Sequence, residues 1–159
     1  MSTPIVYPTN STALDRTASD FYSGLLFGWQ KADLKANMDV CFPDDPELGK
    51  MIGDYIQLMK EGKQDEGKQL FEEMQSKRKA DLEDCLADKD LTDAWDTLQK
   101  AYDDFIAQEN FEAIIGQNYL DNKDAIDGFT AQMFLAWDAE MYYQAGKLVG
   151  LVDGYLYAM

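Results

Sequence analysis

The chain has 159 residues and a formal net charge of −16 at pH 7, and 46% of its residues are hydrophobic. This apolar content is too high for an intrinsically disordered protein, and the length suffices for one domain with a buried core. All four prolines lie within the first 46 residues, which leaves the rest of the chain free for long helices.

Residues 1–13 form a polar, proline-containing lead-in without the basic start and the apolar run of a secretory signal. We expect residues 14–159 to form a single helical domain. No stretch approaches the ~20 apolar residues that are needed to cross a bilayer. We therefore expect a soluble protein without a transmembrane segment, with an intracellular location as the default.

Helical periodicity begins soon after the lead-in. A first helix is expected over about 14–38, or from Thr17, because large apolar side chains recur there at helical spacing. Asp45 as N-cap and Pro46 at the first helical position begin a second helix, which Gly62 ends. The apolar stripe of this second helix consists of Leu48, Met51, Ile52, Tyr55, Ile56 and Met59.

A third helix is expected over about 65–86, with a charged outer face in the stretch QSKRKADLED. A tight turn at Gly62 folds the segments at about 46–62 and 65–86 into an antiparallel helical hairpin. A fourth helix is expected to start near Asp90 or Thr92, with apolar residues at steps of three and four.

The last third of the chain is helical in pattern as well. Residues 111–120 either extend the fourth helix or form a separate short one, and a last long helix runs from Asp121 or Asn122 almost to the end. No segment alternates with the period of two that a strand requires. The sequence therefore predicts an all-α fold, a compact bundle of about five to six helices that includes the hairpin.

The two cysteines are placed symmetrically about the expected hairpin turn. Cys41 and Cys85 each lie 22 residues from Lys63. Equal rise along both arms brings them to the same level at the open end of the hairpin, where a disulfide becomes possible. The alternative is a pair of reduced thiols that fill space in the core. A bridge would favour an oxidising compartment or a secreted protein.

Glycines recur at one-turn spacing in the first and last expected helices: Gly24 and Gly28 in the first, Gly146, Gly150 and Gly154 in the last. Each glycine inside a helix costs about 1 kcal/mol relative to alanine. This cost predicts a close approach of helix backbones that offsets it. Two arrangements are open: the two terminal helices pack on each other, which we favour, or these glycines contact another subunit.

The residue types that most enzymes need are missing. The chain contains no histidine, which removes the Ser-His-Asp and Cys-His systems and the Glu-x-x-His motif of di-iron bundles. The two glycine motifs that bind phosphate groups, the GxxxxGK[ST] loop and the GxGxxG fingerprint, are both absent. Asp121, Asp124 and Asp127 suggest calcium, but an EF-hand register centred on Gly128 puts Lys123 at the first ligand position. We expect no catalytic, cofactor-binding or metal-binding residues and no enzyme, although a carboxylate pair remains conceivable as acid and base.

Acidic residues are concentrated in the second half of the chain. Residues 81–159 carry 17 acidic and 4 basic side chains, whereas residues 1–80 carry 13 and 10. Such a surface repels phosphate backbones and anionic lipid, so we expect no nucleic-acid partner. It suits a basic protein partner, or it only keeps the chain soluble.

The chain is also rich in side chains that protein interfaces favour, with three Trp, nine Tyr, eight Phe and eight Met. Together these features favour a non-catalytic structural or protein-interaction subunit of a larger assembly, bound to other protein subunits or to copies of itself. One alternative is a helical module that binds a small apolar ligand or pigment. A second alternative is an acidic mimic of nucleic acid that inhibits a basic protein.

Overall fold

The computed structural model describes residues 16–157, which contain eight α-helices, one short 3-10 helix and no strand. The elements are α1 (Thr17–Gln30), α2 (Lys35–Cys41), α3 (Pro46–Lys60), α4 (Gln64–Leu82), η1 (Glu83–Cys85), α5 (Lys89–Ile106), α6 (Phe111–Asp121), α7 (Lys123–Asp138) and α8 (Tyr142–Leu156). The all-α prediction is confirmed, but the predicted count of five to six helices is too low. The polar lead-in, 1–13, lies outside the described residues.

Two expected long helices are each broken by one residue with a left-handed backbone. The expected helix over 14–38 stops at Lys31, whose φ is 61° and whose amide donates to the carbonyl oxygen of Phe27 at 2.8 Å. The expected last helix breaks in the same way at Glu140, where φ is also 61°. Neither residue is a glycine or an asparagine, the residues that usually mark such a cap.

Other boundaries differ by a few residues. α4 ends at Leu82, and η1 turns the chain before α5 begins. α5 starts at Lys89, slightly before the expected Asp90 or Thr92, because the carboxylate of Asp88 accepts a hydrogen bond from the amide of Leu91 at 3.1 Å. The segment that could have extended the fourth helix forms the separate helix α6.

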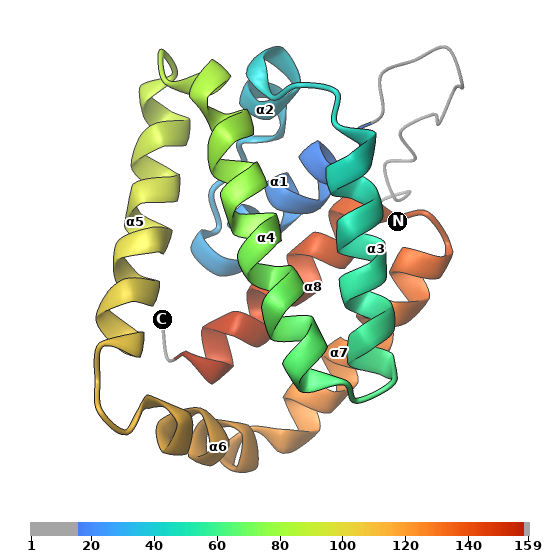
Figure 1. Ribbon diagram of the computed structural model, residues 1–159, viewed down its shortest axis with the longest axis vertical. Helices are drawn as coiled ribbons and strands as arrows, with labels where there is room; N and C mark the ends of the chain where they lie inside the picture. The colour runs from blue at the N-terminus through green and yellow to red at the C-terminus, as the bar shows by residue number, and fades with distance from the viewer. Residues whose placement is uncertain (1–15, 158–159) are drawn as a thin grey trace.

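The hairpin of α3 and α4 is present, and the local signals that predict it are in place (Figure 1). Asp45 accepts a hydrogen bond from the amide of Leu48 at 3.0 Å and so caps α3. Gly62 turns the chain with a φ of 72°, a conformation that glycine adopts without strain. Ile52 and Ile56, on the predicted stripe, are buried.

The first and last described helices form the centre of the bundle. α8 packs against α1 and also against α7, and the α3–α4 hairpin and α5 lie around the pair of α1 and α8 (Figure 1). α4 and α5 stand side by side in Figure 1, but few of their backbone positions approach closely. Long side chains therefore bridge these two helices. None of the described helices combines the length and the apolar content needed to span a bilayer.

Candidate functional site

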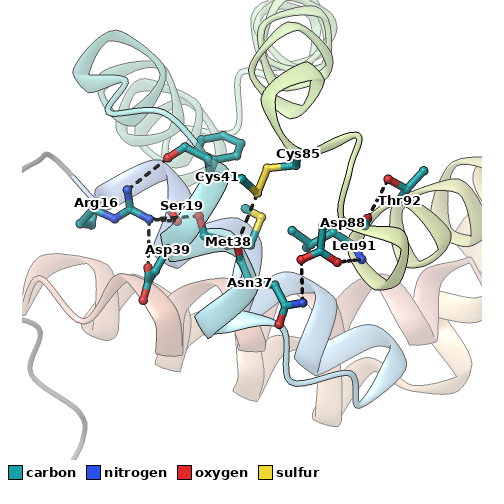
Figure 2. Close-up of a disulfide and its surroundings, with 11 residues drawn as sticks. Arg16, Ser19, Asn37, Met38, Asp39, Cys41, Cys85, Asp88, Leu91 and Thr92 are labelled. Atoms are coloured by element: carbon teal, nitrogen blue, oxygen red, sulfur yellow. Dashed lines mark hydrogen bonds and ion pairs between the residues drawn. A yellow bond between two sulfur atoms is a disulfide. The ribbon is translucent and has the colours of Figure 1, made fainter.

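A disulfide joins Cys41, at the end of α2, to Cys85, at the end of η1 (Figure 2). Their Cα atoms lie 5.1 Å apart. The two residues meet at the open end of the hairpin, but Cys41 belongs to the separate helix α2 and not to a continuous arm of the hairpin. Of the two states left open by the sequence, the structure contains the bridge.

Hydrogen bonds fix the helices on both sides of the disulfide (Figure 2). Arg16 donates to the carbonyl oxygens of Phe42 and Met38 and pairs with Asp39, which ties α2 to the start of α1. Asn37 donates to the carboxylate of Asp88 at 2.8 Å, which ties α2 to the cap of α5. The disulfide and these hydrogen bonds thus hold α2 to the starts of α1 and α5 and to the end of η1.

A groove of about 230 Å³ lies between α4 and α5, beside the disulfide. We call it the α4–α5 groove and define it by six of its lining residues: Arg78, Leu82, Leu86, Leu91, Trp95 and Gln99. Leu91 and Trp95 are buried, whereas the side chain of Leu86 is 68% exposed. The groove thus has an apolar interior and an apolar edge open to solvent.

A wider depression of about 800 Å³ lies over the disulfide itself. Polar and charged groups such as Asn37, Asp88, Lys89 and Asp90 make up much of its lining. Water solvates such groups well, so the depression offers little apolar surface to a ligand. The smaller α4–α5 groove is the better candidate, because apolar surface that leaves water on binding is a main source of affinity.

Arg78 is the unusual group in the α4–α5 groove. Its side chain is buried, with 6% of the residue exposed, and its guanidinium carbon lies 4.6 Å from the ring centre of Trp95 and 5.6 Å from that of Tyr22. Its guanidinium donates one long hydrogen bond, 3.4 Å from Nη2 to Oε1 of Gln99. Burial lowers the pKa of Arg78 from its ordinary value, and Tyr22 opposes this change. An arginine nevertheless stays charged near neutral pH.

No ion pair between Arg78 and a carboxylate occurs among residues 16–157. Its Nε atom is buried without a hydrogen-bond acceptor, and so is the indole Nε1 of Trp95. A buried charge without a counter-charge costs several kcal/mol, of which two aromatic faces return roughly 2 kcal/mol. Two of the residues that line the groove thus carry buried donors without acceptors, and one of the two also carries a positive charge without a counter-charge.

Sequence reasoning missed this arginine and placed the stretch around it on a charged outer face. Arg78 follows Met74 by four residues and precedes Leu82 by four, a spacing that puts all three on one side of a helix. The spacing was thus visible in the sequence. The outer-face prediction is wrong for Arg78, which is buried.

The glycines lie where the backbones of α1 and α8 touch. A Cβ atom at Gly24, Gly28, Gly146 or Gly150 would overlap a backbone oxygen of the opposite helix. The overlapped oxygens are those of Tyr143 and Lys147 for Gly24 and Gly28, and those of Phe21 and Leu25 for Gly146 and Gly150. Gly154 lies in the last turn of α8 and is partly buried. The structure thus brings four of the five glycines together within one chain.

One close pair of carboxyl groups occurs at the start of α3. Burial, and then a hydrogen bond with Asp45, raises the pKa of Asp81 to about 7. Burial opposes the ionisation of Asp45, but hydrogen bonds from Asp81, the amide of Leu48 and Lys77 outweigh it and lower the pKa of Asp45. Because Asp45 also caps α3, the pair has a sufficient structural role, and we do not assign it a catalytic one.

A second carboxyl group with a raised pKa, that of the half-buried Asp153 in α8, lies near Tyr55, Tyr102 and Tyr157. Burial raises the pKa of Asp153 from 3.8 to about 7. Burial, and then the charge of Asp153, raises the pKa of Tyr55 to about 12 and also raises the pKa values of Tyr102 and Tyr157. The rings of Tyr102 and Tyr157 are 5.6 Å apart. These aromatic side chains therefore pack within the chain.

We expect Asp153→Asn to raise the free energy of unfolding at pH 8 by roughly 2–4 kcal/mol and to leave it unchanged near pH 4. The unfolded chain releases the proton of Asp153 near its ordinary pKa, whereas the folded chain holds it to about pH 7. Stability is therefore lost as the pH rises between these values. Chemical denaturation of both proteins at pH 4, 6 and 8 measures the difference.

The difference between the two proteins is the informative quantity, because Asp81 also has a raised pKa and adds its own pH dependence in both. A difference in unfolding free energy that stays constant from pH 4 to pH 8 would contradict the assignment to Asp153.

Comparison with known proteins gives no family for this chain: no family model, no curated protein and no solved structure matches it. Function is therefore inferred from the geometry of the chain itself.

Proposed function

We propose that the chain is a non-catalytic binding protein whose α4–α5 groove holds a small apolar ligand. The observation that supports this most is the composition of the groove, where Leu82, Leu91 and Trp95 line an opening that Leu86 borders from the solvent side. A concave apolar surface with a few polar groups is the usual form of a small-molecule site.

The size of the groove restricts the ligand. Its volume of about 230 Å³ is below the roughly 300–1,000 Å³ of sites for drug-sized molecules, but above the ~150 Å³ of an engineered cavity that holds benzene. A single ring with a short substituent fits this range. A pigment is too large for the α4–α5 groove, so we do not retain that part of the alternative.

The disulfide supports a binding role because it fixes one wall of the groove. Cys85 lines the groove and is bonded to α2 through Cys41. A site that is held in shape before the ligand arrives loses less conformational entropy on binding. The bridge also favours a function in an oxidising compartment.

Leu86→Gln is expected to weaken the binding of benzyl alcohol about fivefold, because it removes roughly 1 kcal/mol of apolar contact at the edge of the groove. Leu86 is exposed, so the fold should tolerate the change. The indole N–H signal of Trp95, followed by NMR during titration, measures the affinity.

Leu135→Gln is the matched control, since Leu135 is 70% exposed on α7 and does not line the groove. It should bind like the wild type. The indole signals of Trp29 and Trp137 report on other parts of the molecule and should not move. If benzyl alcohol at millimolar concentration did not shift the indole N–H signal of Trp95, the proposed function would be refuted.

A second candidate is the interaction subunit that the sequence favours, and helix α6 supports it. No residue of α6 is fully buried, although the helix carries Phe111, Ile114, Ile115 and Tyr119. Leu120, at its end, is 65% exposed. The other four side chains are only partly buried, and apolar side chains that the chain itself covers incompletely are typical of a protein interface. Light scattering from the purified chain separates this candidate from a monomeric binding protein.

A further inference from the structure

We infer that the ligand of the α4–α5 groove is a small organic acid whose carboxylate pairs with Arg78 and whose apolar body lies against Leu82 and Leu91. This inference rests on the proposed function, that the groove binds a small apolar molecule. It adds the chemical class of the ligand and the residue that selects it.

Arg78 carries a buried positive charge that no described carboxylate balances. A buried cation is normally paired with an anion, and none of the described carboxylates forms an ion pair with this one. The chain carries 30 acidic residues, so the absence of a partner at this position does not reflect a shortage of carboxylates. An anion supplied from outside would complete the site.

Two buried donors beside the groove lack acceptors, and a carboxylate could accept from them. Nε of Arg78 and Nε1 of Trp95 are both buried donors without acceptors, and both side chains line the groove. A carboxylate is an acceptor with two oxygens and binds a guanidinium in a planar, two-bond geometry. A neutral hydroxyl could satisfy one donor but could not balance the charge.

The shape of the groove then selects against a bare inorganic anion. Arg78 lies against aromatic rings, and Leu82 and Leu91 complete an apolar wall. An inorganic ion would lose its hydration there without removing apolar surface from water. An acid with a ring or a branched chain gains from both parts of the site.

The negative charge of the protein opposes an anion, but its effect is smaller at this position. The nearby carboxylates of Glu83 and Asp96 are exposed, and charges in solvent at 4 Å interact by only about 1 kcal/mol. A pair at the same distance near a protein surface gains about 4 kcal/mol. The contact with buried Arg78 therefore outweighs repulsion from the rim.

The test compares 3-phenylpropionate with 3-phenylpropionamide, which have nearly the same shape and differ in charge. The acid should bind the wild-type chain at least tenfold more tightly, and it should shift the indole N–H signal of Trp95 further than the amide does. Sodium sulfate at the same concentrations should leave that signal in place.

Arg78→Met is the diagnostic variant, because it keeps much of the volume and removes the charge. It should reduce the affinity for the acid to that for the amide and leave amide binding unchanged. Without ligand it should melt at or above the temperature of the wild type, since an unpaired buried charge has been removed. A purely structural arginine would instead lower the melting temperature when replaced. Arg78→Lys, which keeps the charge but not the planar fork, should bind the acid with intermediate affinity.

The possible outcomes distinguish the proposed function of the groove from the role of Arg78. Equal binding of acid and amide would overturn the role of Arg78 and leave the proposed function standing. Failure of both compounds to shift Trp95 would overturn both. A sulfate response as large as that of the acid would show a general anion site and contradict selection for an organic acid. The comparison in the wild type decides these points even if Arg78→Met does not fold.

Discussion

Gly146→Ala is expected to lower the free energy of unfolding by roughly 3–5 kcal/mol. A Cβ atom at this position would overlap the carbonyl oxygen of Phe21 and lie 3.0 Å from the amide nitrogen of Leu25. Both contacts are with backbone, which cannot move aside as a side chain can. α1 and α8 would have to separate along their length, and the core residues between them would lose contact. Urea denaturation followed by circular dichroism measures the loss.

Two other glycines provide the control, because they lie in helices with free space around them. Nothing lies within 4 Å of a Cβ atom at Gly116 in α6 or at Gly128 in α7. Alanine at either position should stabilise the chain by about 0.5–1 kcal/mol through its better helix propensity. If Gly146→Ala changed the molecular mass in solution but not the unfolding free energy, the glycines would serve contact between subunits instead.

Loss of the Cys41–Cys85 bridge is expected to destabilise the chain by roughly 4 kcal/mol. The cysteines are separated by 44 positions, and releasing a loop of this length returns conformational freedom to the unfolded chain. For a domain of this size the melting temperature should fall by about 8–16 °C. Thermal melts of the wild type with and without a phosphine reductant measure the effect.

The double variant Cys41→Ala with Cys85→Ala separates the bridge from the packing of the sulfur atoms. It should melt close to the reduced wild type and should not respond to the reductant. Mass spectrometry of the native wild type should show a gain of two hydrogens on reduction. Free thiols in the untreated protein, or a melting temperature that reduction leaves unchanged, would contradict the bridge.

Local signals were sufficient to predict the hairpin, whereas they left two states open for the cysteines. Asp45, Pro46 and Gly62 act through their own backbone and side chains, so the start and end of α3 follow from neighbouring residues alone. The hairpin therefore depends on short stretches of chain, which one sequence describes fully. The bridge needs more than equal helical rise, because Cys41 lies in α2 and non-helical residues separate it from α3.

The helix breaks could not be predicted, because they occur at residues that carry none of the local signals of a helix end. Lys31 and Glu140 adopt a left-handed backbone without being residues that favour it. Nothing in the local sequence distinguishes them from residues inside a helix, and the predicted count of helices was too low for this reason.

The candidate site could not be predicted from the sequence either, for a related reason. Spacing places Arg78 on the apolar side of α4, but its lack of a counter-charge depends on which side chains α5 places opposite. Trp95 and Gln99 occupy that position. A partner on a distant helix is a property of the assembled fold and leaves no pattern in a short window of sequence.

The pairing of α1 with α8 also determines when the fold can be completed during synthesis. α1 leaves the ribosome before the other described helices, and the helix that covers its glycines is made more than a hundred residues later. Contacts so distant along the chain form slowly, and the earlier helices expose apolar surface until these contacts have formed. Nascent chains that stall before Tyr142 should therefore be targets for chaperones or proteases, although most of the bundle has already been translated.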